Sequence, residues 1–231
     1  MIALDRPGMG LSDHQPRRTL VDWPDDVNQA AAALALDRFA VLGISGGTPY
    51  VAACAWKLGD RLTGAGIVSG LSPVDVPGVM EGMGRQNRLA FQVVGRVGVL
   101  RRLLMAKSAV SVRREPDRVL ESGVAAEVDK QYLRRPSVRS ILAASLSEAY
   151  RSGSRGPAWE LGLYARPWGF RPADIHVPVH LWHGEQDANH PVAMGRYLAG
   201  VIPQCEATFY PGEGHLHFVD RLPDILTAVC P

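Results

Sequence analysis

The chain has 231 residues, of which 46% are hydrophobic and 21% are charged, and its formal net charge is +2. This composition predicts one globular domain with a substantial core, large enough to carry an inserted subdomain. A charge so close to neutral gives no whole-chain reason to expect a nucleic-acid partner. The three cysteines, Cys54, Cys205 and Cys230, have unrelated spacings. They therefore indicate neither a disulfide framework nor a zinc site, and they fit a reducing, cytoplasmic setting.

The sequence also contains no apolar run of roughly 18 residues or more and no charged-then-apolar leader at its start. We therefore expect a soluble protein that has no membrane partner and is not exported.

The first part of the chain alternates between strand and helix patterns. Residues 1–4 predict a buried strand, which breaks into a Gly/Pro/Asp loop over residues 5–13, where Asp5 and Asp13 are expected to organise the loop. Residues 19–36 predict a helix with Trp23 and Val27 on its apolar face. Residues 64–69 predict a further short apolar strand. This alternation predicts an α/β fold in which a mostly parallel, doubly wound sheet is covered by helices on both faces.

The most informative stretch is Phe39 to Ala55, in which an apolar run stops at Gly43-Ile44-Ser45-Gly46-Gly47 and a helical pattern follows at once. A Gly-x-Ser-x-Gly turn between a strand and a helix places its serine at a strained apex, where backbone approaches backbone. The pattern predicts Ser45 as a nucleophile and the backbone N–H of Gly46 as a donor to a developing oxyanion. The alternative is a glycine-rich turn in which a serine only caps the helix.

The alternation stops near residue 72 and resumes near residue 177, and the intervening residues have helical periodicity. We expect helices over Leu89 to Met105, Val119 to Leu133 and Val138 to Tyr150. Helices inserted after a strand lie over the crevice where doubly wound sheets bind ligands. The sequence therefore predicts three parts: residues 1–72 and 173–231 form a core, and residues 73–172 form a helical lid.

The predicted lid differs in charge from the rest of the chain. Residues 76–170 contain 16 Lys and Arg against 8 Asp and Glu. This excess could favour an anionic substrate, but charge runs on helices are usually solvated, and we favour that interpretation. The apolar stripe Val93, Val97, Leu100 and Leu104 suggests either a lipid-facing flap or packing against the sheet domain, and the second is expected.

The last third of the chain supplies partners for Ser45. A strand over residues 177–182 leads into His183-Gly184-Glu185-Gln186-Asp187, and a helix over residues 191–199 follows. A strand over residues 207–210 then leads into a Gly-flanked loop that carries His215. Both loops follow parallel strands, so Asp187 and His215 are expected at the same sheet edge as Ser45.

Four segments, DRPGMGLSD, VLGISGG, VPVHLWHGEQD and PGEGH, resemble the successive motifs of the α/β-hydrolase superfamily, in its lid-bearing branch of small serine esterases. The resemblance covers essentially the whole chain. It implies that Ser45 is the nucleophile, Asp187 the acid and His215 the base, and that the N–H of Gly46 donates to the oxyanion. A serine at the elbow separates the chain from the branches that carry an aspartate there.

These residues imply a serine hydrolase that acts on a small ester-like or related carbonyl substrate through an acyl-enzyme. No organic cofactor and no metal is required, because His180 and His190 lack a ligand-like spacing to other donors. His183 is expected to pack or to form hydrogen bonds at the end of its strand, and His217 is expected to face the lid or to start a helix. Glu185 is the alternative acid if Asp187 points elsewhere. The expected partner is a small-molecule substrate.

The chain departs from the family pattern at its start, because it begins at what would be the family's fourth strand. The loop after the family's third strand normally donates the second oxyanion N–H. We therefore expect a segment upstream of Met1, or else pairing of the exposed strand edges within the chain or in a homodimer. The alternative function is that of a truncated or inactive hydrolase-fold protein that binds a ligand without turning it over.

Overall fold

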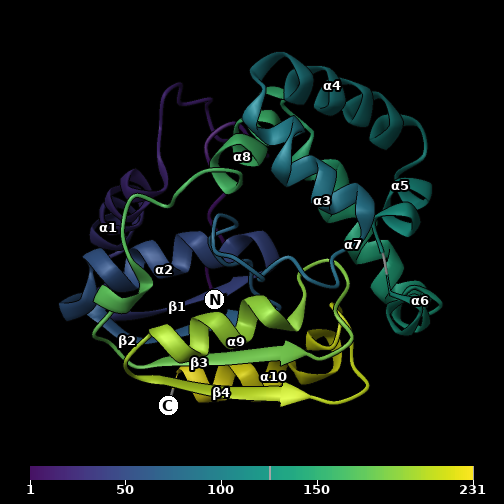
Figure 1. Cartoon of the computed structure of the whole chain (residues 1–231). Coiled ribbons are helices and arrows are strands. Elements are labelled where there is room, and N and C mark those ends of the chain that lie inside the picture. Colours follow the sequence, from purple (N-terminus) through teal and green to yellow (C-terminus); the bar gives the residue numbers. More distant parts are fainter. Residues whose placement is uncertain (125, 231) are drawn as a thin grey trace.

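The computed structural model describes residues 1–124 and 126–230, and a four-stranded sheet lies at its centre (Figure 1). The strands lie across the sheet in chain order: β1 (Phe39–Ile44), β2 (Leu62–Val68), β3 (Val179–Gly184) and β4 (Cys205–Tyr210). All three pairings are parallel; Val41 lies opposite Ala65, and Leu181 lies opposite Ala207. The predicted parallel α/β sheet is therefore confirmed.

Helices cover both faces of the sheet. On one face lie α1 (Trp23–Ala33), α2 (Thr48–Lys57) and α9 (Val192–Val201), and on the other lies α10 (Phe218–Val229). Successive strand residues point to opposite faces, so Ile67 packs into the cluster with α2 and α9, while Val68 packs against Ile225 of α10. The sheet is thus buried on both sides, as its continuous apolar strands require.

The chain between β2 and β3 contains six described α-helices. They are α3 (Arg85–Gln92), α4 (Gly98–Arg114), α5 (Pro116–Gly123), α6 (Glu127–Leu133), α7 (Pro136–Ala149) and α8 (Arg155–Tyr164). Figure 1 shows these helices grouped above the sheet, with α6 and α7 beyond the carboxyl ends of β3 and β4. Five short 3₁₀ helices complete the described elements: η1 (Leu20–Asp22), η2 (Ser45–Gly47), η3 (Gly59–Arg61), η4 (Val94–Arg96) and η5 (Pro172–Asp174).

The prediction of one helix over Leu89 to Met105 is wrong. The α-helix ends at Gln92 and a new one begins at Gly98, with η4 between them. Here the backbone passes close to α8: a β-carbon on Gly95 would lie 2.6 Å from that of Ala165 and 2.8 Å from the Leu161 carbonyl oxygen. The two glycines at 95 and 98 also weaken a continuous helix.

The expectation that the apolar stripe packs against the sheet domain is also wrong. The stripe residues Val93, Val97, Leu100 and Leu104 are 37–44% exposed. The side chains that α4 buries are Arg101, Ala109 and Val112. The break between α3 and α4 changes which face of the segment points inward. No helix within residues 1–124 or 126–230 is both long and apolar enough to cross a membrane.

The helix predicted over residues 119–133 is also not continuous, since α5 ends at Gly123 and α6 begins at Glu127. Glycine is a poor helix former, which accounts for an end at this position. Ala125, which the prediction included, lies outside the described residues. The helix predicted over residues 138–150 is confirmed as α7.

The buried strand predicted for residues 1–4 is wrong. These residues lie outside the sheet, and Met1 and Leu4 are 100% and 41% exposed. A strand needs a hydrogen-bonding neighbour, and within the described chain β1 pairs only with β2. The apolar pattern of residues 1–4 was therefore not sufficient to predict a strand of the sheet.

Candidate active site

Ser45 lies at the turn between β1 and α2, where the sequence predicted a strained apex. Its φ is +55°, a left-handed conformation that non-glycine residues rarely adopt. A β-carbon on Gly43 would lie 2.6 Å from the carbonyl oxygen of Gly47, so only glycine fits at this backbone crossing. At Gly47 an added β-carbon would meet no described atom within 4 Å, so the crossing requires the first glycine of the motif but not the second.

A chain of two hydrogen bonds links Ser45 to the loops after β3 and β4. His215 Nδ1 lies 2.7 Å from Asp187 Oδ2, and His215 Nε2 lies 2.9 Å from Ser45 Oγ. A carboxylate only accepts hydrogen bonds, so Nδ1 carries the proton, and Nε2 accepts from the serine hydroxyl. The structure thus brings together the three side chains that the sequence singled out.

Backbone groups hold Asp187 in place. Its Oδ1 accepts hydrogen bonds from the backbone N–H groups of Asn189 and His190, both at 2.8 Å. Glu185, the alternative acid, points away from this chain of bonds and pairs with Arg196 at 2.7 Å on the surface. The geometry therefore favours Asp187 as the partner of His215.

The family comparison agrees with this geometry. A sequence model described as the Alpha/beta hydrolase family matches residues 1–226. The chain belongs to this family. It is accordingly an enzyme of hydrolase type. The comparison with curated proteins found no match.

Solved structures share the fold at low sequence identity. Est816, described as an N-acyl homoserine lactone degrading enzyme, is 23% identical with a TM-score of 0.63, and the match covers 96% of this chain and 78% of that one. The esterase RhEst1 from Rhodococcus sp. ECU1013 is 22% identical with a TM-score of 0.63, over 96% and 76% of the two chains. A bromoperoxidase from Bacillus anthracis is 18% identical with a TM-score of 0.65, over 96% and 77%.

In this hydrolase the two buried members of the hydrogen-bond chain stabilise each other's charged forms. Burial raises the pKa of Asp187, but the charge and hydrogen bond of His215 outweigh it and lower that pKa to about 2. Burial lowers the pKa of His215, and Asp187 outweighs it, so that the pKa lies above the usual 6.5. Asp187 is therefore a carboxylate across the working pH range, and His215 is a stronger base than an ordinary histidine.

Two further histidines lie against this pair. Desolvation lowers the pKa of His190 to about 4, and it also lowers the pKa of His183. The ring of His190 donates to the Ser69 carbonyl oxygen at 2.9 Å, and the ring of His183 donates to the His190 carbonyl oxygen at 2.8 Å. These histidines are neutral hydrogen-bonding residues. Within residues 1–124 and 126–230, no group of three His, Cys, Asp or Glu side chains could hold a metal ion.

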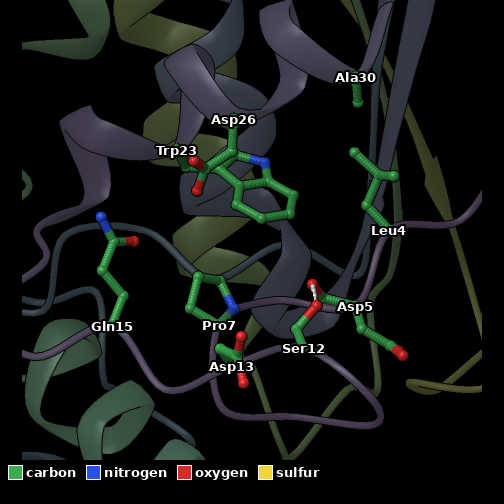
Figure 2. A pocket seen from close by; sticks show the side chains of 9 residues that line it. All are labelled: Leu4, Asp5, Pro7, Ser12, Asp13, Gln15, Trp23, Asp26 and Ala30. Atoms are coloured by element: carbon green, nitrogen blue, oxygen red, sulfur yellow. Dashed lines mark hydrogen bonds between the residues drawn. The ribbon is translucent and has the colours of Figure 1, made fainter. Parts of the chain in front are cut away.

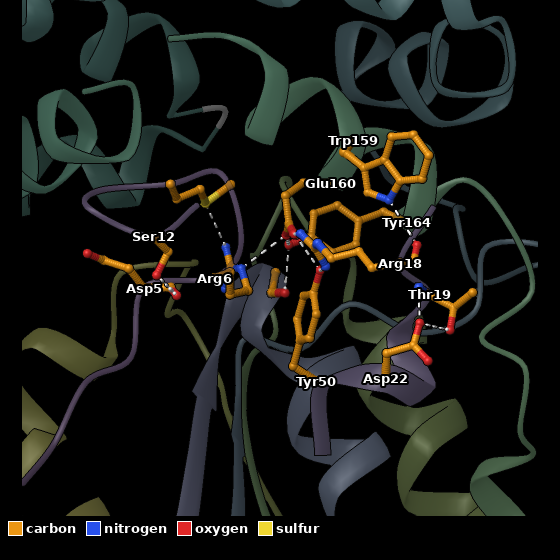
Figure 3. Close-up of polar contacts among 12 residues, drawn as sticks. Asp5, Arg6, Ser12, Arg18, Thr19, Asp22, Tyr50, Trp159, Glu160 and Tyr164 are labelled. Carbon is orange, nitrogen blue, oxygen red and sulfur yellow. Dashed lines mark hydrogen bonds and ion pairs between the residues drawn. The ribbon is translucent and has the colours of Figure 1, made fainter. Parts of the chain in front are cut away.

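The structure also shows a buried polar network that sequence reasoning missed (Figure 3). Its centre is Glu160 on α8, only 3% exposed, which pairs with Arg6 at 3.1 Å and also with Arg18. The hydroxyl groups of Tyr50 and Tyr164 donate to the same carboxylate. The network joins three parts of the chain around the nucleophile turn: the residue 5–18 segment, the helix after Ser45 and the predicted lid.

A second buried carboxylate, Asp129 on α6, was also missed; it contacts the loop that carries His215. Neither Glu160 nor Asp129 belongs to a motif that is readable from the sequence. The available signal is weak: Glu160 falls among apolar residues in a helical stretch, whereas Asp129 has mostly polar neighbours and no such signal.

A hollow of about 300 Å³ lies between the residue 4–15 segment and α1 (Figure 2). Its lining residues include Leu4, Asp13 and Trp23 but none of Ser45, Asp187 and His215. Asp5 at its rim accepts from the backbone N–H of Leu11 at 3.2 Å. Asp5 thus organises its own loop, as expected.

Proposed function

We propose that this chain is a serine hydrolase that cleaves a small ester-like or related carbonyl substrate through Ser45, His215 and Asp187. The observation that carries the proposal is the unbroken hydrogen-bond chain from the Ser45 hydroxyl through His215 to Asp187. The family membership supports hydrolysis in general. The ester and lactone chemistry attached to similar structures suggests the class of carbonyl substrate.

In the first step His215 Nε2 takes the proton of Ser45 as Oγ attacks the carbonyl carbon, and a tetrahedral oxyanion forms. The N–H of Gly46, at the start of the helical turn, donates to that oxyanion. Asp187 stabilises the imidazolium that has formed. The imidazolium then protonates the leaving group, whose bond to the carbonyl carbon breaks, and an acyl-serine remains.

In the second step His215 takes a proton from a water molecule, which attacks the acyl carbon. The carboxylic acid product leaves, and Ser45 regains its proton from His215. Neither step needs an organic cofactor or a metal. The helices of residues 73–172 act as the lid over the substrate, and their shape selects among substrates that share this chemistry.

The direct test is labelling with a fluorophosphonate probe, read by intact mass, on the wild type, Ser45→Ala and Ser122→Ala. Ser122 is an exposed serine on α5 and serves as the matched control. We expect one adduct on the wild type and on Ser122→Ala and none on Ser45→Ala. Folded wild-type protein that takes no adduct would instead support the ligand-binding alternative.

A further inference from the structure

The backbone of His215 is held from two sides. Its carbonyl oxygen accepts a hydrogen bond from Ser69 Oγ at 2.8 Å, which ties the loop to the end of β2. Its N–H donates to Asp129 Oδ2, also at 2.8 Å, and Asp129 belongs to α6 in the predicted lid. One bond therefore comes from the core and the other from the lid.

Asp129 clamps the loop with both oxygens. Its Oδ1 accepts from the backbone N–H of Leu216 at 2.7 Å, and the residue is 0% exposed. A β-carbon on Gly214 would lie 2.5 Å from each of the two oxygens, so the carboxylate lies directly against the loop backbone. Two backbone donors on one buried carboxylate make a charge-assisted contact, which is stronger than a bond between neutral groups.

The same face of α6 makes further contacts with this loop. The Tyr132 hydroxyl, three residues after Asp129, donates to Glu213 Oε2 at 3.0 Å. The Leu216 side chain packs into an apolar cluster with Tyr132, Leu133 and Val138. Helix α6 and the loop that carries His215 are thus packed as one unit, while Ser45 and Asp187 sit on core elements.

We propose that Asp129 is a positioning residue that couples the predicted lid to the catalytic base. Its carboxylate fixes the backbone of His215 as long as α6 is packed against the loop. The proposal rests on the role of His215 proposed above. It gives the lid a second task besides covering substrate: movement of α6 would also displace the imidazole from Ser45. A misplacement of about 1 Å at a reacting group is enough to cost on the order of a hundredfold in rate.

Asp129 also affects the charge of His215. The charged or titratable groups that act on His215 are Asp187 and Asp129, which raise its pKa, and the buried rings of His190, His183 and His217, whose own pKa values are lowered. Burial raises the pKa of Asp129, and the two backbone N–H donors oppose that rise. Loss of the Asp129 charge therefore lowers the pKa of His215, so that the base form persists to lower pH.

The test compares Asp129→Asn with Tyr132→Phe, a control on the same helix. The asparagine keeps the shape of the side chain but loses the charge, and its NH₂ group cannot accept, so one backbone N–H loses its partner. Tyr132→Phe breaks the neighbouring contact between α6 and the loop but leaves both Asp129 bonds intact. We expect Asp129→Asn to lower kcat about 10- to 100-fold with little change in KM, and to move the acid limb of kcat/KM to lower pH. Tyr132→Phe should change neither, although both variants lower the Tm.

A second readout does not depend on turnover: titration of the His215 ring resonances by NMR, assigned by their loss in His215→Gln. A lower pKa in Asp129→Asn but not in Tyr132→Phe supports the coupling, even if the wild type fails to react with a fluorophosphonate and the proposed function falls. An unchanged His215 pKa and an unchanged labelling rate in folded Asp129→Asn would overturn it. Equal effects of the two variants would also overturn it, because the contact would then be structural only.

Discussion

The hydroxyl group of Tyr164 lies 2.8 Å from the carbonyl oxygen of Gly46, so α8 contacts the turn that follows Ser45. The same hydroxyl lies 2.5 Å from Glu160 Oε2. Burial is the first cause that raises the pKa of Tyr164 well above its usual value, so the phenol remains protonated. Tyr164 therefore connects the buried charge network to the turn that carries the proposed nucleophile.

Replacing Tyr164 with phenylalanine removes this connection and leaves Glu160 with one donor fewer. We expect the free energy of unfolding to fall by about 1–3 kcal/mol, and kcat to fall several-fold with KM nearly unchanged. Urea denaturation and steady-state kinetics would measure the two effects. The control is Tyr197→Phe, at a partly buried tyrosine on α9. If both variants behaved alike, Tyr164 would have no special link to the turn.

Replacing Glu160 with glutamine tests the centre of the network. The change leaves Arg6 and the buried guanidinium of Arg18 without their counter-charge. Breaking a buried ion pair from one side costs about 3–5 kcal/mol. Glu148→Gln, which breaks an exposed pair with Arg151, should cost less than about 1 kcal/mol. The measurement compares the denaturant midpoints of the two variants with that of the wild type. A small effect of Glu160→Gln would contradict the role of Glu160 as the centre of the network.

The positions of Ser45, Asp187 and His215 could be predicted from the sequence because each residue lies in a turn directly after a strand. Each of these turns can be recognised from its own neighbouring residues. Gly43 and the left-handed φ of Ser45 are local features of the turn between β1 and α2. Parallel strands then bring their carboxyl ends to one edge, so three distant turns meet without further information. Local chemistry and a simple topology were sufficient for this part of the site.

Asp129 and Glu160 could not be predicted in this way. Asp129 meets a backbone N–H that is 86 residues away, and Glu160 meets an arginine that is 142 residues away. Both contacts depend on how the helices between β2 and β3 pack on the core. The hydrophobic periodicity of the sequence does not predict that packing. The break between α3 and α4 has the same origin, since it follows from the close approach of Gly95 to α8.

The acid role proposed for Asp187 is tested by Asp187→Asn, with Glu185→Gln as control. An amide at 187 favours the wrong tautomer of His215 and removes the charge that stabilises the imidazolium, so kcat should fall roughly 10³- to 10⁴-fold. Glu185 is paired with Arg196 on the surface, and its variant should keep wild-type activity. A loss of activity in Glu185→Gln instead would assign the acid role to Glu185.

In the wild type, the acid limb of kcat/KM should lie above pH 6.5, because Asp187 outweighs burial and raises the pKa of His215.

Two buried histidines predict how stability depends on pH. Desolvation lowers the pKa of both His190 and His217 from 6.5 to about 4. Between these two pH values the unfolded chain therefore binds protons that the folded chain does not bind. The contribution of the two histidines to the free energy of unfolding is complete above pH 6.5 and falls as the pH drops from 6.5 to about 4. The maximum loss is about 3 kcal/mol for each histidine. The raised pKa of His215 acts in the opposite direction, since its contribution is complete below pH 6.5 and is lost as the pH rises through the folded value.

His217 offers the cleanest test of this dependence, because neither of its ring nitrogens has a hydrogen-bond partner within the described residues. His217→Phe removes the titrating group, so the difference in unfolding free energy between pH 7.5 and pH 5, measured in urea, should shrink by about 1–2 kcal/mol. His176→Gln, at an exposed histidine, should leave that difference unchanged. If His217→Phe kept the full wild-type difference, then His217 would be protonated in the folded protein at pH 5. The acid sensitivity would then have to come from His190, His183 and the carboxylates.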